Sequence, residues 1–406
     1  MFNTIDEVYT YIFQKKSKNK SFEKLNLCIN YLDCKPKFPL ILITGTNGKG
    51  STALFIKEIL KEIIHVGLFT SPYVIQYNER IMINDRQISN SEIMYYMNTY
   101  ILKLEEYLKT LNYTLSFFEI TFLISLLYYK DRNIDLGIFE CGIGGLNDTC
   151  NVLEPTLSII TNIGLDHQNV LGNTKEEIAL NKLGIARKNK TLLTSEKDIY
   201  PFLKDYCSKN SINILNVNDN LSNIHYENNH VVFNYKNHLY KTSLNGLFQA
   251  KNASLAIETV NILFPNIDNI LVEYGIKSMK NPARLEILST KPLIILDGAH
   301  NISAINEVLE DVKLISNNKK INILFVPLKD KNYNDMIKVL DNISSKYYFY
   351  QFDDDRNLKI EELEKLTKKD FEIIKDINDI KINDECLLVI GSLHFASFYR
   401  KNFKKC

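Results

Sequence analysis

Residues 39–52 read PLILITGTNGKGST, an apolar run followed by glycines, a lysine and hydroxyl side chains. Pro39–Ile43 is β-prone, and we expect a helix from Ala53. Glycines let backbone N–H groups crowd around phosphate oxygens, while the helix start and Lys49 add positive charge. Gly45–Ser51 departs from the G-x-x-x-x-G-K-[ST] spacing, and a plain glycine turn with a surface lysine is the alternative. The strand–loop–helix context favours nucleotide binding.

Composition excludes several other classes of function. The 406 residues carry 49 Lys+Arg against 48 Asp+Glu, so no global charge favours nucleic acid or an anionic membrane. The seven cysteines are scattered without a Cys-x-x-Cys pair, which predicts neither a zinc site nor disulfides. The most apolar stretch, Leu115–Tyr129, is interrupted by Glu119, and there is no signal-like start. We expect a soluble, cytoplasmic monomer that acts on small molecules.

The order of apolar segments predicts an α/β fold. Strands and helices alternate as far as Leu263, which indicates a mostly parallel P-loop-type sheet domain. Ile224–Leu244 alternates apolar and polar residues, typical of antiparallel hairpins, and forms a small β appendage. A break near Asn281–Arg284 precedes a second, smaller, Rossmann-like α/β domain. We place the domains at 1–286 and 287–406.

Individual elements follow from the same patterns. Helices are predicted over 4–33, Ser91–Leu111 with Ser91 as cap, Phe117–Tyr129, Thr174–Ala186, Leu247–Leu263, Ser303–Ile315, Tyr333–Ile343 and Ile360–Leu366. Strands are predicted at His65–Thr70, Ile81–Ile83, Asp135–Glu140, Thr156–Asn162, Lys190–Thr194, Ile212–Val217, Leu293–Leu296, Ile321–Val326, Tyr347–Phe352, Phe371–Ile374 and Leu387–Ile390.

Polar residues follow several of these strands. Glu140 precedes a Cys-Gly-Ile-Gly-Gly loop, Asp166-His167 follows the next strand, and Asp297-Gly-Ala-His300-Asn301 follows a strand of the second domain. Ligands of open α/β sheets bind at the carboxyl ends of strands, so we expect these groups at binding edges, facing one cleft. Taken singly, Glu140 reads as a solvated strand end, His167 as a structural histidine and Lys182 as a surface lysine.

Together the segments resemble the Mur ligase superfamily and, within it, the folylpolyglutamate synthase and dihydrofolate synthase family. The resemblance covers essentially the whole chain. It rests on Gly45–Ser51, Ser71-Pro72, Asn78-Glu79-Arg80-Ile81, Phe117-Phe118-Glu119, Glu140-x-Gly142-x-Gly144-Gly145-x-x-Asp148, Gly164-Leu165-Asp166-His167, Lys182-x-Gly184-Ile185, Gln249-x-x-Asn252-Ala253, Arg284-Leu285-Glu286, Asp297-Gly298-Ala299-His300-Asn301 and Gly391-Ser392-Leu393.

The resemblance implies a role for each site residue. ATP is expected at Gly45, Asn47, Gly48, Lys49, Gly50, Ser51, Thr52, Asn252, Arg284 and Asp297. Two Mg²⁺ ions are expected at Ser71, Glu140, His167 and a carbamylated Lys182, and the catalytic set is Lys49, Lys182, His167 and His300. Substrate contacts are expected at Arg80, Ser116, Phe117, Phe118, Glu119, Asn147, Asp148, Thr149 and Ser392. Ser392 and His394 would touch glutamate, with a helix cap as the equal alternative for Ser392.

The implied activity is ATP-dependent ligation of L-glutamate to a folate carboxylate through an acyl phosphate, as in folate biosynthesis. Departures from the family pattern are Tyr73, Ala283, Ile302 and the run Leu146–Thr149, and that run bears on dihydropteroate as a substrate. Three alternatives stay open: a bifunctional enzyme that also uses dihydropteroate, a UDP-sugar peptide ligase, and a non-catalytic nucleotide switch. The Phe117-Phe118-Glu119 and Asn78–Arg80 segments favour folate over the UDP-sugar.

Overall fold

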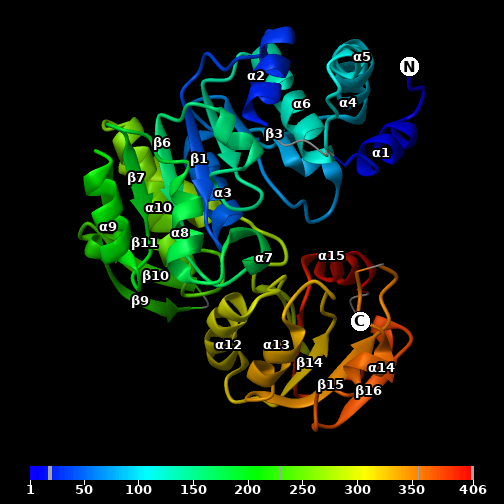
Figure 1. Cartoon of the computed structure of the whole chain (residues 1–406). Coiled ribbons are helices and arrows are strands. Elements are labelled where there is room, and N and C mark those ends of the chain that lie inside the picture. Colours follow the sequence, from blue (N-terminus) through cyan, green and yellow to red (C-terminus); the bar gives the residue numbers. More distant parts are fainter. Residues whose placement is uncertain (17–20, 229, 355, 404–406) are drawn as a thin grey trace. The chain divides into compact units, whose positions relative to one another are not determined.

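The computed structural model describes residues 1–16, 21–228, 230–354 and 356–403 (Figure 1). Contacts divide the chain into two compact units, each of which is discontinuous in sequence. Unit 1 comprises Met1–Ser222 and Lys251–Ile276, and unit 2 comprises Asn223–Ala250 and Lys277–Cys406. The domain boundary expected between residues 286 and 287 stays a prediction.

Unit 1 contains an eight-stranded sheet in the order β4-β3-β2-β5-β1-β6-β7-β8. The strands are β1 (Leu40–Thr44), β2 (Val66–Phe69), β3 (Ile81–Ile83), β4 (Arg86–Gln87), β5 (Leu136–Glu140), β6 (Leu157–Ile160), β7 (Thr191–Thr194) and β8 (Asn213–Asn216). Six neighbouring strands are parallel, in the order β2-β5-β1-β6-β7-β8. β3 and β4 extend the sheet beyond β2 as an antiparallel edge. β1 lies between β5 and β6, so their carboxyl ends meet at one edge of the sheet.

Helices cover this sheet on both faces. They are α1 (Ile5–Phe13), α2 (Phe22–Tyr31), α3 (Lys49–Leu60), α4 (Asn90–Tyr96), α5 (Leu102–Thr110), α6 (Phe117–Asp131), α7 (Gln168–Leu171), α8 (Lys175–Leu183), α9 (Tyr200–Lys209), α10 (Gln249–Leu263) and α11 (Asn269–Ser278). One core joins alternate residues of β1, Leu40 and Leu42, to α6, α2 and α4. The intervening Ile41 and Ile43 are equally buried, as expected of a parallel sheet with two covered faces.

Unit 2 contains two further sheets. The smaller one joins β9 (Leu221–Glu227), β10 (His230–Tyr235) and β11 (His238–Thr242). Lys236 and Asn237 both have positive φ between β10 and β11, which is the signature of a tight hairpin turn. This hairpin confirms the antiparallel pairing that the alternation in Ile224–Leu244 predicts.

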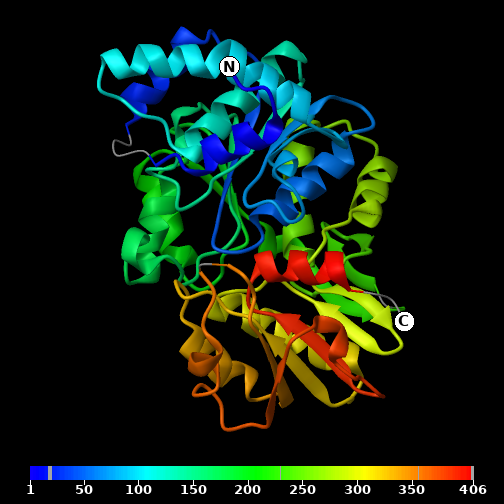
Figure 2. The same cartoon turned by 90° about the vertical axis from the view of Figure 1, so that its right-hand side faces the viewer.

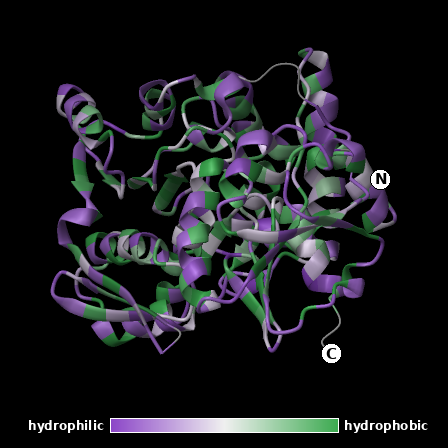
Figure 3. Ribbon diagram, turned by 90° about the horizontal axis from the view of Figure 1, so that it is seen from below, coloured by the Kyte–Doolittle hydropathy of each residue, from purple (hydrophilic) through white to green (hydrophobic). Residues whose placement is uncertain are grey.

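The larger sheet of unit 2 has the order β12-β13-β17-β14-β15-β16, parallel except for β12. Its strands are β12 (Glu286–Thr290), β13 (Leu293–Leu296), β14 (Ile321–Phe325), β15 (Ser344–Tyr350), β16 (Phe371–Ile374) and β17 (Cys386–Ile390), with helices α12 (Ile302–Ser316), α13 (Tyr333–Leu340), α14 (Ile360–Leu363) and α15 (Leu393–Asn402). Figure 2 shows α15 in red beside this sheet. Helices of the chain carry hydrophobic and hydrophilic residues side by side (Figure 3), and in unit 2 one face of α12 and of α13 joins the core.

Several element bounds differ from those expected. The helix expected from Ala53 begins at Lys49, because Gly48 occupies the N-cap with φ 83° and residues 49–52 form the first turn. The cap assigned to Ser91 is wrong, since Ser89 caps α4. Of the helix expected over 4–33, α1 and α2 are present, and residues 17–20 lie outside the described residues. The patterns did not reveal α11, β12 and α15.

Candidate active site

The phosphate loop lies between β1 and α3, at the sheet edge where parallel strands end. A Cβ atom on Gly48 would stand 2.3 Å from Oδ1 of Asn252 in α10, so this glycine leaves room for that side chain. Lys49 Nζ donates to the carbonyls of Gly45 (3.0 Å) and Thr46 (3.3 Å) within its own loop. Ser51 and Thr52 are buried in the first turn of α3. The loop is thus folded around the start of α3 as an anion site requires.

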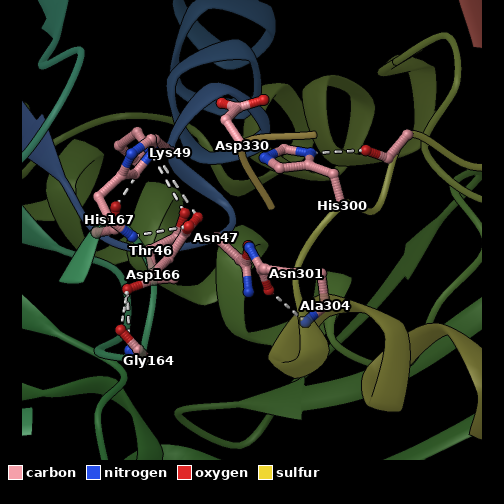
Figure 4. Close-up of polar contacts among 12 residues, drawn as sticks. Thr46, Asn47, Lys49, Gly164, Asp166, His167, His300, Asn301, Ala304 and Asp330 are labelled. Carbon is pink, nitrogen blue, oxygen red and sulfur yellow. Dashed lines mark hydrogen bonds and ion pairs between the residues drawn. The ribbon is translucent and has the colours of Figure 1, made fainter. Parts of the chain in front are cut away.

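The segment Asn162–His167, which we term the strap, follows β6 and is bonded to the phosphate loop. Thr46 N–H donates to the Asn162 carbonyl (3.0 Å). The Thr46 hydroxyl donates to the Gly164 carbonyl (3.1 Å) and accepts from the Gly164 N–H (2.9 Å) (Figure 4). The strap ends at His167, which has φ 51° and precedes α7 with its side chain 36% exposed. Asp166 Oδ2 lies 3.9 Å from His167 Nε2.

Glu140 ends β5 beside the phosphate loop. Its carboxylate is buried, and Oε2 accepts the Ser71 N–H at 3.1 Å. A Cβ on Gly50 would lie 3.5 Å from the same Oε2, so Glu140 faces the first turn of α3. A carboxylate beside a phosphate loop has the chemistry that a hard cation such as Mg²⁺ prefers. Among the described residues no group of three His, Cys, Asp or Glu side chains could hold a metal, so any site here must recruit other ligand types.

Lys182 in α8 is 2% exposed, so it is not a surface lysine. Burial, reinforced by the positive charge of Lys49, lowers the pKa of Lys182 from 10.5 to about 7. Asp148 and Asp166 act on the amine in the opposite sense. A substantial fraction of this amine is therefore neutral, and so nucleophilic, near neutral pH.

The glycine loop after β5, residues 142–145, is organised by polar side chains beneath it. Asp148 Oδ2 accepts the N–H groups of Gly142 (2.8 Å) and Ile143 (3.2 Å), and Asp148 is buried. Burial raises the pKa of Asp148 although its backbone hydrogen bonds oppose the rise. Asn181 Oδ1 accepts the Gly145 N–H at 3.0 Å. Asn147 is exposed and Thr149 half-buried on the same turn.

Aromatic rings line the start of α6. The Phe118 ring would meet a Cβ on Gly142 at 3.3 Å, and it packs edge-on against Phe69. The Arg80 guanidinium lies between the rings of Tyr73 (5.1 Å) and Phe117 (5.0 Å). Arg80 is buried, and its Nε and Nη1 have no hydrogen-bond partner among the described residues. Burial lowers the pKa of Arg80. A buried cation with unpartnered N–H groups pays a desolvation cost that a bound anion would offset.

Two predicted substrate residues on this helix are engaged with the protein itself. Ser116 caps α6, and the Glu119 carboxylate accepts from the Ser116 N–H (2.8 Å) and hydroxyl (2.9 Å). The other Glu119 oxygen pairs with Lys24 Nζ at 2.7 Å, and both side chains are buried. These contacts fix the first turn of α6 and thereby the rings of Phe117 and Phe118.

In unit 2, Asp297 follows β13 and binds two backbone loops. Its Oδ2 accepts the Leu285 N–H and its Oδ1 the Ala299 N–H, both at 2.7 Å. Burial raises the pKa of Asp297, while the charge of Arg284 opposes the rise. Ala283 and Leu285, on either side of Arg284, have φ values of 56° and 49°. Such left-handed backbone is uncommon without glycine and concentrates at functional sites.

The remaining candidates of unit 2 lie at two helix starts. His300 Nδ1 donates to the Gly298 carbonyl at 2.9 Å, just before α12 (Figure 4). Ser392 is buried and caps α15, accepting the Phe395 N–H at 3.4 Å. His394 Nδ1 lies 3.3 Å from Asp354.

Comparisons with known proteins identify the family of the chain. The Mur ligase middle domain matches residues 43–260, and the Mur ligase glutamate ligase domain matches residues 283–386. The chain is 34% identical to the dihydrofolate synthase/folylpolyglutamate synthase of Bacillus subtilis (strain 168), with 89% of this chain and 90% of the relative covered. The chain belongs to the folylpolyglutamate synthase/dihydrofolate synthase family of the Mur ligase superfamily. It is an ATP-dependent ligase.

Solved structures of this ligase family share the fold. The folylpolyglutamate synthase of Thermotoga maritima superposes with a TM-score of 0.85 at 26% identity, covering 98% of this chain and 96% of that one. An FPGS–AMPPCP–folate complex gives a TM-score of 0.83 at 25% identity, covering 98% and 99%. Within the described residues of the ligase, no helix is long and apolar enough to cross a membrane.

Sequence reasoning missed three side chains that organise the site of this ligase. Lys24 pairs with Glu119 in the first turn of α6, while Asn181 and Glu196 accept N–H groups of the loops after β5 and β6. None of the three stands in a recognisable motif. A buried lysine gives no signal in composition. The sequence offered one clue that Asn181 contributes to the site, namely that it directly precedes Lys182 in the predicted helix.

Proposed function

We propose that this ligase joins the amine of L-glutamate to the carboxylate of a folate, consuming ATP and releasing ADP and phosphate. The observation that carries the proposal is Arg80, a buried cation close to two aromatic rings in the same unit as the phosphate loop. Its Nε and Nη1 have no hydrogen-bond partner in the described part of the chain. That combination suits a planar substrate that ends in a carboxylate. The family's complex with AMPPCP and folate supports the same substrate pair.

The reaction needs ATP because a carboxylate is a poor acyl donor. A carboxylate oxygen attacks the γ-phosphorus of ATP, the bond to ADP breaks, and an acyl phosphate forms. The glutamate amine then attacks the acyl carbon, loses a proton, and phosphate leaves from the tetrahedral intermediate. Lys49 neutralises negative charge on the transferred group, and the N–H groups at the start of α3 bind the remaining phosphates. Gly45, Asn47 and Asn252 shape this loop.

Magnesium fits the residues around the phosphate loop. Glu140 supplies a buried carboxylate, and Ser71, His167 and Lys182 are the further ligands that we propose. Bound Mg²⁺ would offset phosphate charge. We propose that Lys182 is carbamylated, because its buried amine has no ion pair among the residues that the structure describes, and as a carbamate it would be an anion beside a cation. Glu140 is the one acidic residue among these four proposed ligands. The carbamate on Lys182 would supply the second negative charge needed to hold two Mg²⁺ ions.

The acyl acceptor is proposed to lie along the start of α6. Phe117 and Phe118 offer ring faces, Arg80 binds the carboxylate, and Asn147 and Thr149 lie on the loop that Asp148 supports. In unit 2, Arg284 and Asp297 are proposed to serve nucleotide binding, His300 catalysis and Ser392 glutamate binding.

Phosphate release tests this function. Purified chain with ATP, Mg²⁺ and L-glutamate should release phosphate when a folate is added and stay silent without it. Release independent of folate and of glutamate would refute the ligase, and absence of turnover with intact ATP binding would favour the non-catalytic switch.

A second acceptor follows from the comparison with Bacillus subtilis, since the name of that relative covers dihydrofolate synthase activity as well. Dihydropteroate in place of folate distinguishes the bifunctional enzyme from one restricted to polyglutamylation. The run Leu146–Thr149 contains residues that we propose contact the acceptor, so its exchange for Arg-Leu-Asp-Ala should raise any dihydropteroate activity.

A further inference from the structure

The strap, Asn162–His167, is held from two sides. Towards the phosphate loop, Asn162 accepts two backbone N–H groups. Its carbonyl accepts the Thr46 N–H at 3.0 Å, and its Oδ1 accepts the Asn47 N–H at 2.9 Å. The reciprocal contacts between Thr46 and Gly164 add a third and a fourth bond. The position of the phosphate loop therefore depends on the position of the strap.

On the other side of the strap stands Glu196, which follows β7 and is 5% exposed. Its Oε2 accepts the Ile163 N–H at 2.7 Å, and both groups are buried. Its Oε1 accepts the N–H groups of Lys197 at 3.0 Å and Asp198 at 2.9 Å. The carboxylate thus links the strap to the end of the neighbouring strand through N–H donors alone.

We propose that Glu196 is a positioning residue of the nucleotide site: it holds the strap against the phosphate loop and so sets the places of that loop and of His167. The inference rests on the proposed function, because the loop must bind ATP for its position to matter. Glu196 touches no reacting group and acts through the strap.

The contact geometry demands a carboxylate at this position. Both oxygens accept from N–H donors, and a carboxylate is the side chain that offers acceptors at both ends. In Glu196→Gln one end becomes an amide NH₂ that faces an N–H donor, so one set of bonds is lost without a change of volume. Hydrogen bonds to a charged acceptor are also stronger than neutral ones.

The end of β7 is held by hydrogen bonds that do not use the Glu196 carboxylate. Holding this loop and holding the strap can therefore be tested separately. The Ser195 hydroxyl donates to the Thr161 carbonyl at 2.6 Å, and Asn216 Nδ2 donates to the Glu196 carbonyl at 2.7 Å. The Glu196 N–H donates to the Thr194 hydroxyl at 3.0 Å. The loop after β7 is therefore held in place by groups other than the Glu196 carboxylate. The bond that the carboxylate makes to the loop of another strand is the one to the Ile163 N–H.

The test compares Glu196→Gln with Thr194→Val in the full chain. Thr194→Val is nearly isosteric and removes the bond to the Glu196 backbone while leaving the carboxylate in place. Calorimetric titration with AMPPCP and Mg²⁺ should show affinity about tenfold weaker for Glu196→Gln, the loss of one charge-assisted hydrogen bond, and within about twofold of the wild type for Thr194→Val. Amide exchange across residues 162–167 of the nucleotide-free chain should accelerate in Glu196→Gln alone.

Unchanged affinity and unchanged exchange in Glu196→Gln would overturn the inference, as would a lowered melting temperature with wild-type affinity. If the wild-type protein bound no AMPPCP, the proposed function would be overturned. That result differs from equal binding by the wild type and Glu196→Gln, which would overturn only the role of Glu196. If Glu196→Gln does not fold, Glu196→Asp replaces it, because the shorter side chain keeps its charge and withdraws from Ile163. The same two readouts then decide.

Discussion

Replacing Lys182 with methionine should change how the stability of the protein depends on pH. In the folded chain Lys182 releases its proton near pH 7, whereas in the unfolded chain it does so near its ordinary value of 10.5. Between these values the unfolded state holds one more proton than the folded state. The free energy of unfolding therefore rises with pH across this window, by up to about 1.4 kcal/mol per pH unit.

The magnitude follows from the same two pKa values. From pH 7 to pH 9 the folded amine passes from half to almost full deprotonation, which adds about 2 kcal/mol to the stability of the wild type. Over the whole window the contribution is about 5 kcal/mol. Lys182→Met keeps the length of the side chain and has no proton to release, so it lacks this rise.

Urea unfolding at pH 7, 8 and 9, in buffers purged of carbon dioxide, measures the effect. The stability of the wild type relative to Lys182→Met should rise by about 2 kcal/mol from pH 7 to pH 9. Lys175→Met, a half-buried lysine of α8 paired with Asp198, is the matched control, because ion pairing raises the pKa of Lys175 and keeps it charged throughout. A constant difference between wild type and Lys182→Met would refute the reasoning. Bicarbonate should further stabilise the wild type alone if the amine is carbamylated.

Three further predictions concern single positions. Gly48→Ala should destabilise the protein by about 1–2 kcal/mol and raise the KM for ATP, because its backbone has φ 83° and a Cβ would crowd Asn252. Gly50→Ala, whose Cβ would have an ordinary contact, is the control for stability, and an equal loss of stability in urea unfolding would contradict the argument. Ala283→Gly should stabilise by up to about 1 kcal/mol, since glycine relieves the left-handed φ of 56°; a lower melting temperature would count against strain there. Arg80→Met should raise the KM for folate at least tenfold at an unchanged KM for ATP, because its loss removes the acceptor's carboxylate partner (about 1.5–3 kcal/mol); a change confined to ATP would reassign Arg80.

The fold was largely predictable because many of its strands are short apolar runs, and β1, β5, β13 and β17 end in, or are followed by, a glycine or an acid. Capping signals were also present: Ser89 and Glu92 have the capping-box spacing, and that pattern would have placed the cap of α4 correctly. The early start of α3 was hidden, since glycines at 48 and 50 read as loop residues although Gly48 ends the loop with a left-handed backbone. For α15 the signal was Ser392, which the sequence analysis weighed as a helix cap without placing the helix, and which does cap α15.

The candidate site divides in a similar way. Motifs predicted which residues stand near strand ends, because that depends on local order along the chain. They did not predict that Glu119 would pair with Lys24, or that Arg80 would lie between two rings, because those contacts join segments far apart in sequence. The buried state of Lys182 likewise depends on packing around α8 and not on its neighbours in the sequence.

The contact between Gly48 and Asn252 has a consequence for synthesis of the chain. Asn252 belongs to α10, which the ribosome delivers about half a chain later than the phosphate loop, at roughly 5–20 residues per second. Unit 1 therefore completes its nucleotide site only after the hairpin of unit 2 has emerged. We therefore expect nucleotide binding by a nascent chain to begin once α10 is available, so ATP would favour chains that include α10 over shorter ones.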